Sequence, residues 1–100
     1  MSGYTFASGS ITGAGAKLQA SGQVVWTPSR TALGCYSITF AAAHPLGTTY
    51  IANVSASGAY AVVRNGTYAP TSTVLQISTY TVGTATAIDP LIVYFMVLAS

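Results

Sequence analysis

The sequence predicts an all-β domain of about eight short antiparallel strands. Short runs of β-branched residues and tyrosine alternate with turn residues such as Gly, Pro, Asn and Ser, and helical periodicity is nearly absent. Short strands with regularly spaced turn signals are typical of a sandwich or a barrel. Two packed sheets of about four strands each, the arrangement of a jelly-roll β-sandwich, accommodate that number.

The first third of the chain carries the weakest strand signals. Residues 4–6 (Tyr-Thr-Phe) predict a short opening strand, and residues 7–22 are rich in Gly, Ser and Ala. Over residues 1–22 that composition is typical of a loosely structured segment or of an edge strand wrapped along its neighbours. Residues 23–27 predict the next strand, which residues 28–31 (Pro-Ser-Arg-Thr) end.

The middle of the chain predicts clearer strands. Residues 34–40 alternate most cleanly, with Tyr36, Ile38 and Phe40 on one face and hydroxyl side chains on the other. The loop that follows contains His44. Further strands are predicted over 49–55, 59–64 and 74–81.

The last strand has no polar side. After Pro90, eight apolar residues follow in a row, which is far below the roughly 20 that a membrane-spanning helix needs. Val93, Phe95 and Val97 fill one face of the predicted strand, and the alternate positions fill the other. A single core covers one face, so we expect identical chains to cover the second. The alternate positions are Ile92, Tyr94, Met96 and Leu98.

Size and charge limit the remaining possibilities. At 100 residues the chain has the length of one domain, which spans residues 1–100. Charged residues make up 4% of it, against roughly 25% in an ordinary domain. We expect part of the surface to be hidden in an oligomer and the rest to be hydroxyl-rich. The three cations are scattered, whereas nucleic-acid binding needs clustered Lys and Arg, so no nucleic-acid partner is expected.

Two segments resemble a known family, the trimeric jelly roll of tumour necrosis factor and of complement-type globular heads. Residues 34–40 resemble its Gly-X-Tyr-X-(apolar)-X-Phe strand, and residues 89–98, with Val93-Tyr94-Phe95, resemble its final strand. The chain is also similar to the C-terminal tips of phage tail fibres and of viral or spore-surface collagen-like proteins. The resemblance covers roughly residues 23–100.

The resemblance implies a homotrimer whose final strand lies in the inner sheet. Tyr94, Met96 and Leu98 would then face the threefold axis, and Val93, Phe95 and Val97 would enter the core. The predicted trimer interface is therefore the face of Ile92, Tyr94, Met96 and Leu98. The chain is shorter than the animal proteins and poorer in charge, which favours a viral or phage fibre tip over a signalling ligand.

Enzymatic chemistry is not expected. Acid–base cleavage of sugars needs two carboxylates, and Asp89, which precedes a proline at a predicted turn, is the one acidic side chain. One His, one Cys and one Asp do not make a metal site, so neither a metal nor a cofactor is expected. We expect His44 to be a solvated loop residue and Cys35 to be a buried free thiol.

A receptor site is predicted at the turns. A loop over residues 64–71 presents an arginine, an amide and a tyrosine together, and residues of these kinds stack on sugars and bind their hydroxyl groups. Trp26 also lies near a turn, but packing is the more common role for a tryptophan. The predicted receptor-binding residues are Arg30, Arg64, Asn65 and Tyr68.

The predicted function is host attachment by the tip of a viral or phage fibre, through a cell-surface saccharide or protein. Two alternatives stay open: a trimerisation cap that binds no ligand, and a cytokine-like or complement-like ligand. Met1 to Tyr4 lacks the charged start and apolar stretch of a signal peptide. We therefore expect synthesis in a host cytoplasm, display on the virion or fibre surface, and no insertion into a membrane.

Overall fold

The computed structural model describes residues 5–48, 50–64, 68–84 and 86–99, and these residues form eight strands. The strands are β1 (Thr5–Thr12), β2 (Lys17–Ser21), β3 (Trp26–Ala32), β4 (Cys35–Phe40), β5 (Ala52–Ala56), β6 (Ala59–Val63), β7 (Val74–Thr81) and β8 (Ile92–Leu98). The predicted all-β class and the predicted strand number are confirmed.

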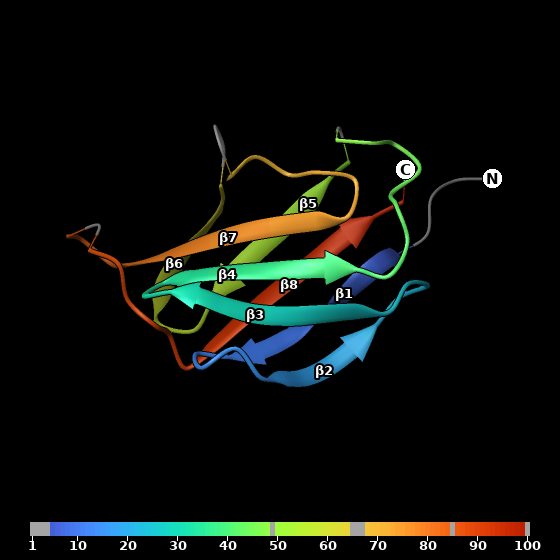
Figure 1. Ribbon diagram of the computed structural model, residues 1–100. Helices are drawn as coiled ribbons and strands as arrows, with labels where there is room; N and C mark the ends of the chain where they lie inside the picture. The colour runs from blue at the N-terminus through green and yellow to red at the C-terminus, as the bar shows by residue number, and fades with distance from the viewer. Residues whose placement is uncertain (1–4, 49, 65–67, 85, 100) are drawn as a thin grey trace.

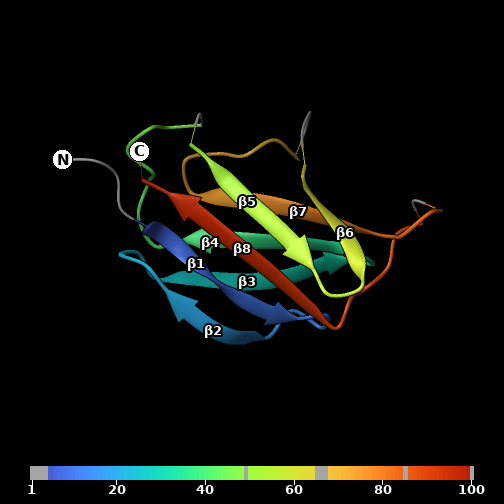
Figure 2. The same cartoon turned by 180° about the vertical axis from the view of Figure 1, so that it is seen from behind.

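All eight strands belong to one antiparallel sheet, in the order β2-β1-β8-β5-β6-β7-β4-β3. The sheet bends so that its two halves face each other. Figure 1 shows β3, β4 and β7 in front. Figure 2, seen from behind, shows β2, β1, β8 and β5 across the back. Because β6 pairs with both β5 and β7, it joins the two layers.

The strand pairs are nested along the chain. β1 pairs with β8, β4 with β7, and β5 with β6. Within β4 to β7, the consecutive strands β5, β6 and β7 lie side by side, and β4, which precedes them in the chain, lies on the far side of β7. This is the order of a Greek key, read from the last strand to the first. Nesting of this kind brings the last strand into the middle of the back layer, between β1 and β5.

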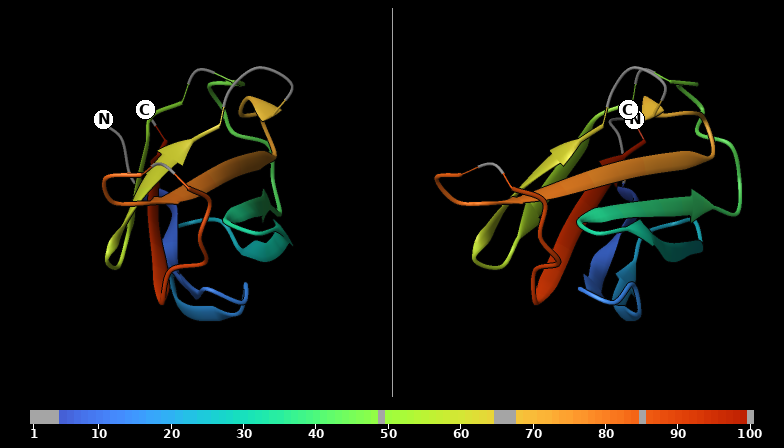
Figure 3. Two further views of the ribbon diagram at one scale, coloured as in Figure 1. Left: turned by 90° about the vertical axis from the view of Figure 1, so that its left-hand side faces the viewer. Right: turned by 60° about the vertical axis from the view of Figure 1, so that its left-hand side comes forward.

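The sheet is nearly closed on itself, with β2 and β3 as its two edges (Figure 3). The segment that links these strands runs along β1, where the N–H groups of Gln23 and Val24 donate to the carbonyls of Thr5 and Phe6. The indole N–H of Trp26 then donates to the Ser8 carbonyl at 3.1 Å. These bonds draw the start of β3 toward β1 and narrow the open side of the sheet.

Side chains from both layers meet in one core. The inward positions of β4 and β7 fill its front side, with Tyr36, Ile38, Leu75 and Ile77 fully buried. The burial of Tyr36 and Ile38 is as predicted. Aromatic rings pack edge to face across it, Trp26 against Phe95 and Phe6 against Phe40. The buried apolar residues are Phe6, Ala7, Ile11, Trp26, Tyr36, Ile38, Phe40, Leu75, Ile77, Val93, Phe95, Val97 and Ala99.

The Gly/Ser-rich segment is more ordered than its composition suggests. Residues 5–12 form β1, an interior strand that pairs with β2 on one side and β8 on the other. Only the β2 part, residues 17–21, lies at an edge. At Gly9 a β-carbon would collide with the Trp26 ring and the Gln19 carbonyl. The small residues therefore permit close packing at this position.

The prediction that residues 28–31 end a strand is wrong, because these residues lie within β3. Pro28 has no N–H to donate, which confines proline in sheets to edges and bulges. Because β3 pairs only with β4 within the described part of the chain, the proline is tolerated there.

Candidate functional site

The outward-facing side chains of β8 form an apolar surface in the middle of the back layer. Val93, Phe95 and Val97 are buried in the core. On the opposite side, Tyr94 and Met96 are 44% and 41% exposed in the single chain. We call this surface the outer β8 face and define it by Ile92, Tyr94, Met96 and Leu98, of which the first and last are half-buried.

Small polar residues border the outer β8 face. Ser8 and Ser10 of β1 pair with Met96 and Tyr94 on one side, and Asn53 and Ser55 of β5 pair with the same two residues on the other. Asn53, Val54, Ser55, Tyr94, Phe95 and Met96 line a shallow hollow of about 240 Å³. The long side chains of β8 therefore protrude beyond the short side chains of β1 and β5 on either side. A second surface can pack into the hollows that this leaves.

Arg64 and Tyr68, two of the predicted receptor-binding residues, lie together beyond the end of β6. The guanidinium carbon of Arg64 lies 3.7 Å from the centroid of the Tyr68 ring, which is a cation–π contact. Asn65 falls outside the described residues. A pocket of about 380 Å³, which we call the β6–β7 pocket, is lined by Val62, Val63, Arg64, Tyr68, Ser78 and Tyr80.

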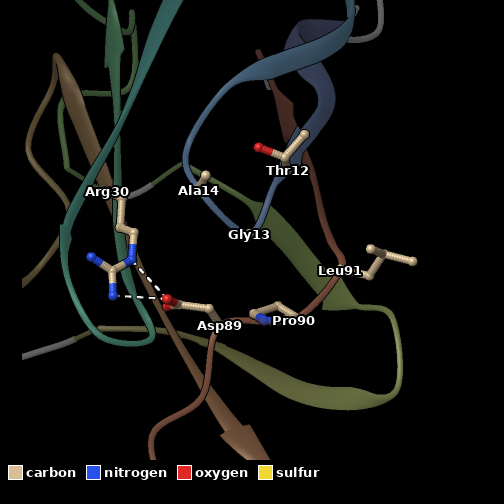
Figure 4. Close-up of a pocket in the computed structure, with 7 residues that line it drawn as sticks. All are labelled: Thr12, Gly13, Ala14, Arg30, Asp89, Pro90 and Leu91. Carbon is tan, nitrogen blue, oxygen red and sulfur yellow. Dashed lines mark hydrogen bonds and ion pairs between the residues drawn. The ribbon is translucent and has the colours of Figure 1, made fainter.

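Arg30, the fourth predicted receptor-binding residue, lies in a different place. Its Nε atom donates to Oδ2 of Asp89 at 2.8 Å, and its Nη2 atom forms an ion pair with the same oxygen at 2.7 Å (Figure 4). The other carboxylate oxygen accepts from the Gly34 N–H at 2.7 Å and from the Tyr36 hydroxyl at 3.1 Å. We call this group the Asp89 corner. It borders an open hollow of about 760 Å³ that is also lined by Gly13, Pro90 and Leu91.

The pKa shifts at the Asp89 corner follow from these bonds. Hydrogen bonds from Arg30 and then from the Gly34 N–H lower the pKa of Asp89 below its ordinary value. Burial, followed by the hydrogen bond to Asp89, raises the pKa of Tyr36 to about 12. The hydroxyl of Tyr36 also donates to the Gly13 carbonyl at 2.8 Å. The ion pair thus ties the β1–β2 turn, β3, β4 and the entry to β8 together.

The prediction that His44 is solvated is wrong, because the residue is 3% exposed. Its ring stacks on Tyr50 and contacts Phe6. Nδ1 accepts from the Leu46 N–H at 3.0 Å, so the ring proton is assigned to Nε2, which lies 2.7 Å from the Leu98 carbonyl. His44 therefore holds the loop after β4 against the end of β8.

The exposure of Trp26 and Cys35 tests two further predictions. Trp26 is 1% exposed and packs in the core, as predicted. Cys35 is a free thiol, but it is half-buried where full burial was expected. Among the described residues, no three His, Cys, Asp or Glu side chains gather as a metal site would require. No helix in these ranges is long and apolar enough to cross a bilayer.

Sequence reasoning missed the organising role of Asp89. A single acidic residue among three cations was the available signal, since the one carboxylate of so uncharged a chain has a cation to pair with. Comparison of the chain with protein-family models, with curated proteins and with solved structures found no match.

Proposed function

We propose that this chain is the homotrimeric tip domain of a viral or phage fibre, which attaches to a host cell surface without catalysing a reaction. The single observation that carries the proposal is the outer β8 face. Because this apolar surface lies in the middle of the back layer rather than at its edge, a partner can cover it together with the strands on both sides.

The charge distribution supports self-association at this face. Lys17 lies on the edge strand β2, Arg30 on the edge strand β3, and Asp89 is paired with Arg30. No charged residue lies in β1, β5 or β8. Copies of the chain can therefore meet over β8 without burying an unpaired charge, which would be strongly destabilising.

The strand order supports a jelly roll as the finer description of the fold. A jelly roll pairs its first strand with its last and contains Greek keys. The nested pairs and the Greek-key order of β4 to β7 agree with that scheme. The family that the sequence resembles uses its final strand at a threefold axis, and closed cyclic symmetry lets one apolar patch be buried in every copy.

Attachment benefits from three copies of a weak site. When linked sites engage one surface together, avidity rises by about 10²–10⁴ without any new contact. The β6–β7 pocket, with Arg64 stacked on Tyr68, is the site that we assign to the receptor.

Sedimentation tests the assembly. At micromolar concentration we expect a mass three times the 10.2 kDa of one chain. Tyr94→Asp and Met96→Lys should each give monomers, because they place three unpaired charges at one buried seam, at a cost of about 3–5 kcal/mol for each charge. Tyr68→Asp is the matched control, since it puts the same charge on an exposed tyrosine away from β8 and should stay trimeric. A monomeric wild type, or a trimeric Tyr94→Asp, contradicts the proposal.

Binding of labelled trimer to host cells tests the attachment. The double variant Arg64→Ala/Tyr68→Ala should remain trimeric and lose cell binding. A trimer that binds no host cell would contradict the attachment function and leave the two alternatives, a trimerisation cap and a cytokine-like or complement-like ligand.

A further inference from the structure

The β6–β7 pocket lies on the outward side of a cross-strand ladder. Tyr60 pairs with Tyr80 and Val62 with Ser78. Beyond the end of β6, the N–H of Arg64 donates to the Gln76 carbonyl at 2.9 Å and so extends the pairing by one step. Since side chains alternate along a strand, residues 60, 62 and 64 share one face, and the guanidinium of Arg64 reaches the same side as Ser78 and Tyr80.

Arg64 differs from the other two cations in what it contacts. Arg30 is paired with Asp89, and the ammonium group of Lys17 lies 4.3 Å from the centroid of the Trp26 ring at the edge of the sheet. Asp89 is the one acidic side chain in the sequence. Among the described residues, the guanidinium of Arg64 therefore has an aromatic partner in Tyr68 but no anionic one.

The stacked geometry leaves the binding edge of Arg64 available. An aromatic ring covers one face of the guanidinium plane, whereas the N–H donors point outward within that plane. Two parallel N–H groups match the two oxygens of a carboxylate, and such charge-assisted pairs are roughly twice as strong as neutral ones. The chemistry at this end of the pocket is therefore complementary to a carboxylate.

The rest of the pocket offers hydroxyl groups and ring surface. Ser78 is 5% exposed, and within the described part of the chain its hydroxyl and those of Tyr68 and Tyr80 make no hydrogen bond. The volume of about 380 Å³ lies at the small end of the range for ligand sites, which suits one or two sugar rings. Hydroxyl groups around an open pocket, next to aromatic rings, are suited to a polyhydroxylated ring.

We infer that the β6–β7 pocket binds a saccharide that carries a carboxylate. Arg64 pairs with the carboxylate, Tyr68 holds the guanidinium in place, and Ser78 and Tyr80 bind the sugar hydroxyls. This inference rests on the proposed attachment function and specifies the chemical class of its receptor as an acidic glycan.

A titration of the trimer with D-glucuronate tests the inference. We expect saturable shifts of the amide resonances of Arg64, Ser78 and Tyr80. The neutral methyl ester of the same sugar, D-glucose and acetate should each bind at least about tenfold more weakly, because a charge-assisted bond or the ring contacts are then missing.

Variants identify the anion partner. Arg64→Gln should weaken glucuronate binding about tenfold, and Arg64→Lys should restore part of it, since lysine keeps the charge but not the planar fork. Lys17→Gln is the control, because it removes one positive charge outside the pocket and should bind as the wild type does. Unchanged thermal midpoints show that the variants are folded.

Four results would overturn the inference: no saturable binding of glucuronate, equal binding of glucose, equal binding of acetate, or the same affinity in Arg64→Gln. Tighter binding of glucose 6-sulfate would reassign the anion as a sulfate and would also overturn it.

Failure of the attachment function is distinguishable from failure of this inference. A trimer that binds host cells but not glucuronate loses the ligand class alone, whereas a monomer that binds glucuronate but no cell loses the fibre-tip function alone.

Discussion

Asp89 accepts three hydrogen bonds on one carboxylate, from Nε of Arg30, the N–H of Gly34 and the hydroxyl of Tyr36. Nη2 of Arg30 adds an ion-pair contact at 2.7 Å. These partners favour the charged form, which is why the pKa of Asp89 lies below its ordinary value. Asp89 is also the one acidic side chain of the sequence, so the acid limb of the stability profile reports on it with little interference from other carboxylates.

Acidification should therefore destabilise the wild type through Asp89. A group whose pKa is lowered by folding contributes stability above its unfolded value, which is about 3.9 for aspartate, and loses it as the pH falls through the folded value. We expect the thermal midpoint of Asp89→Asn to lie below that of the wild type at pH 7. The gap should close as the pH falls below about 4. Calorimetry across this pH range measures it, and a constant gap would show that the carboxylate charge is unimportant.

His44 carries a second prediction at this scale. His44→Phe keeps the ring stacked on Tyr50 but removes the donor to the Leu98 carbonyl, which should cost about 1–3 kcal/mol of unfolding free energy. His44→Ala should cost more, because the ring contacts are lost as well. Urea denaturation gives the order of stability. If both variants match the wild type, the residue is the solvated loop histidine that the sequence predicted.

Residues of this kind are hard to find from sequence because their partners are remote. The oxygens of Asp89 bind groups 53 to 59 positions away, and His44 meets a carbonyl 54 positions away. Neither contact has a local pattern. By contrast, Tyr36, Ile38 and Phe40 alternate within one strand, and that alternation predicted their burial correctly.

At the scale of elements, propensity misjudged two strands for opposite reasons. The Gly/Ser-rich composition of β1 resembles a flexible leader, yet β1 lies inside the sheet because its small residues let Trp26 approach. Pro28 looked like a strand end, yet β3 continues past it because its second edge is unpaired within the described residues. In both cases the neighbouring strands determine whether the segment forms a strand, and the sequence of a single segment carries no information about those neighbours.

The packing of β1 gives a prediction of its own. Gly9→Val should destabilise the domain by at least about 1–3 kcal/mol, because the new side chain meets the Trp26 ring and the Gln19 carbonyl. Ala20→Val, at the paired position of β2 but exposed, should change stability by less than about 0.5 kcal/mol. Chemical denaturation compares the two. Equal effects would mean that β1 is as loosely held as its composition suggests.

For the whole molecule, the sequence predicted the all-β class and the number of strands because both depend on local spacing. The near-closure of the sheet could not be predicted from the sequence. It depends on β6 pairing with both layers and on the Trp26 indole at the open side, and these are contacts between distant segments. Alternation divides β8 into two apolar faces but does not say which one enters the core, and the surface that covers its outer face stays a prediction.

Assembly should make the thermal midpoint depend on protein concentration, which the unfolding of a single chain does not do. If folding and trimer formation are coupled over the outer β8 face, unfolding releases three chains, and mass action stabilises the trimer by about 2.7 kcal/mol for each tenfold rise in protein concentration. The thermal midpoint of the wild type should therefore rise with concentration. The midpoint of Tyr94→Asp, which unfolds as a single chain, should be lower and independent of concentration. Scanning calorimetry over a hundredfold range of concentration measures both, and a flat wild-type profile would show that Tyr94 and Met96 face water in solution.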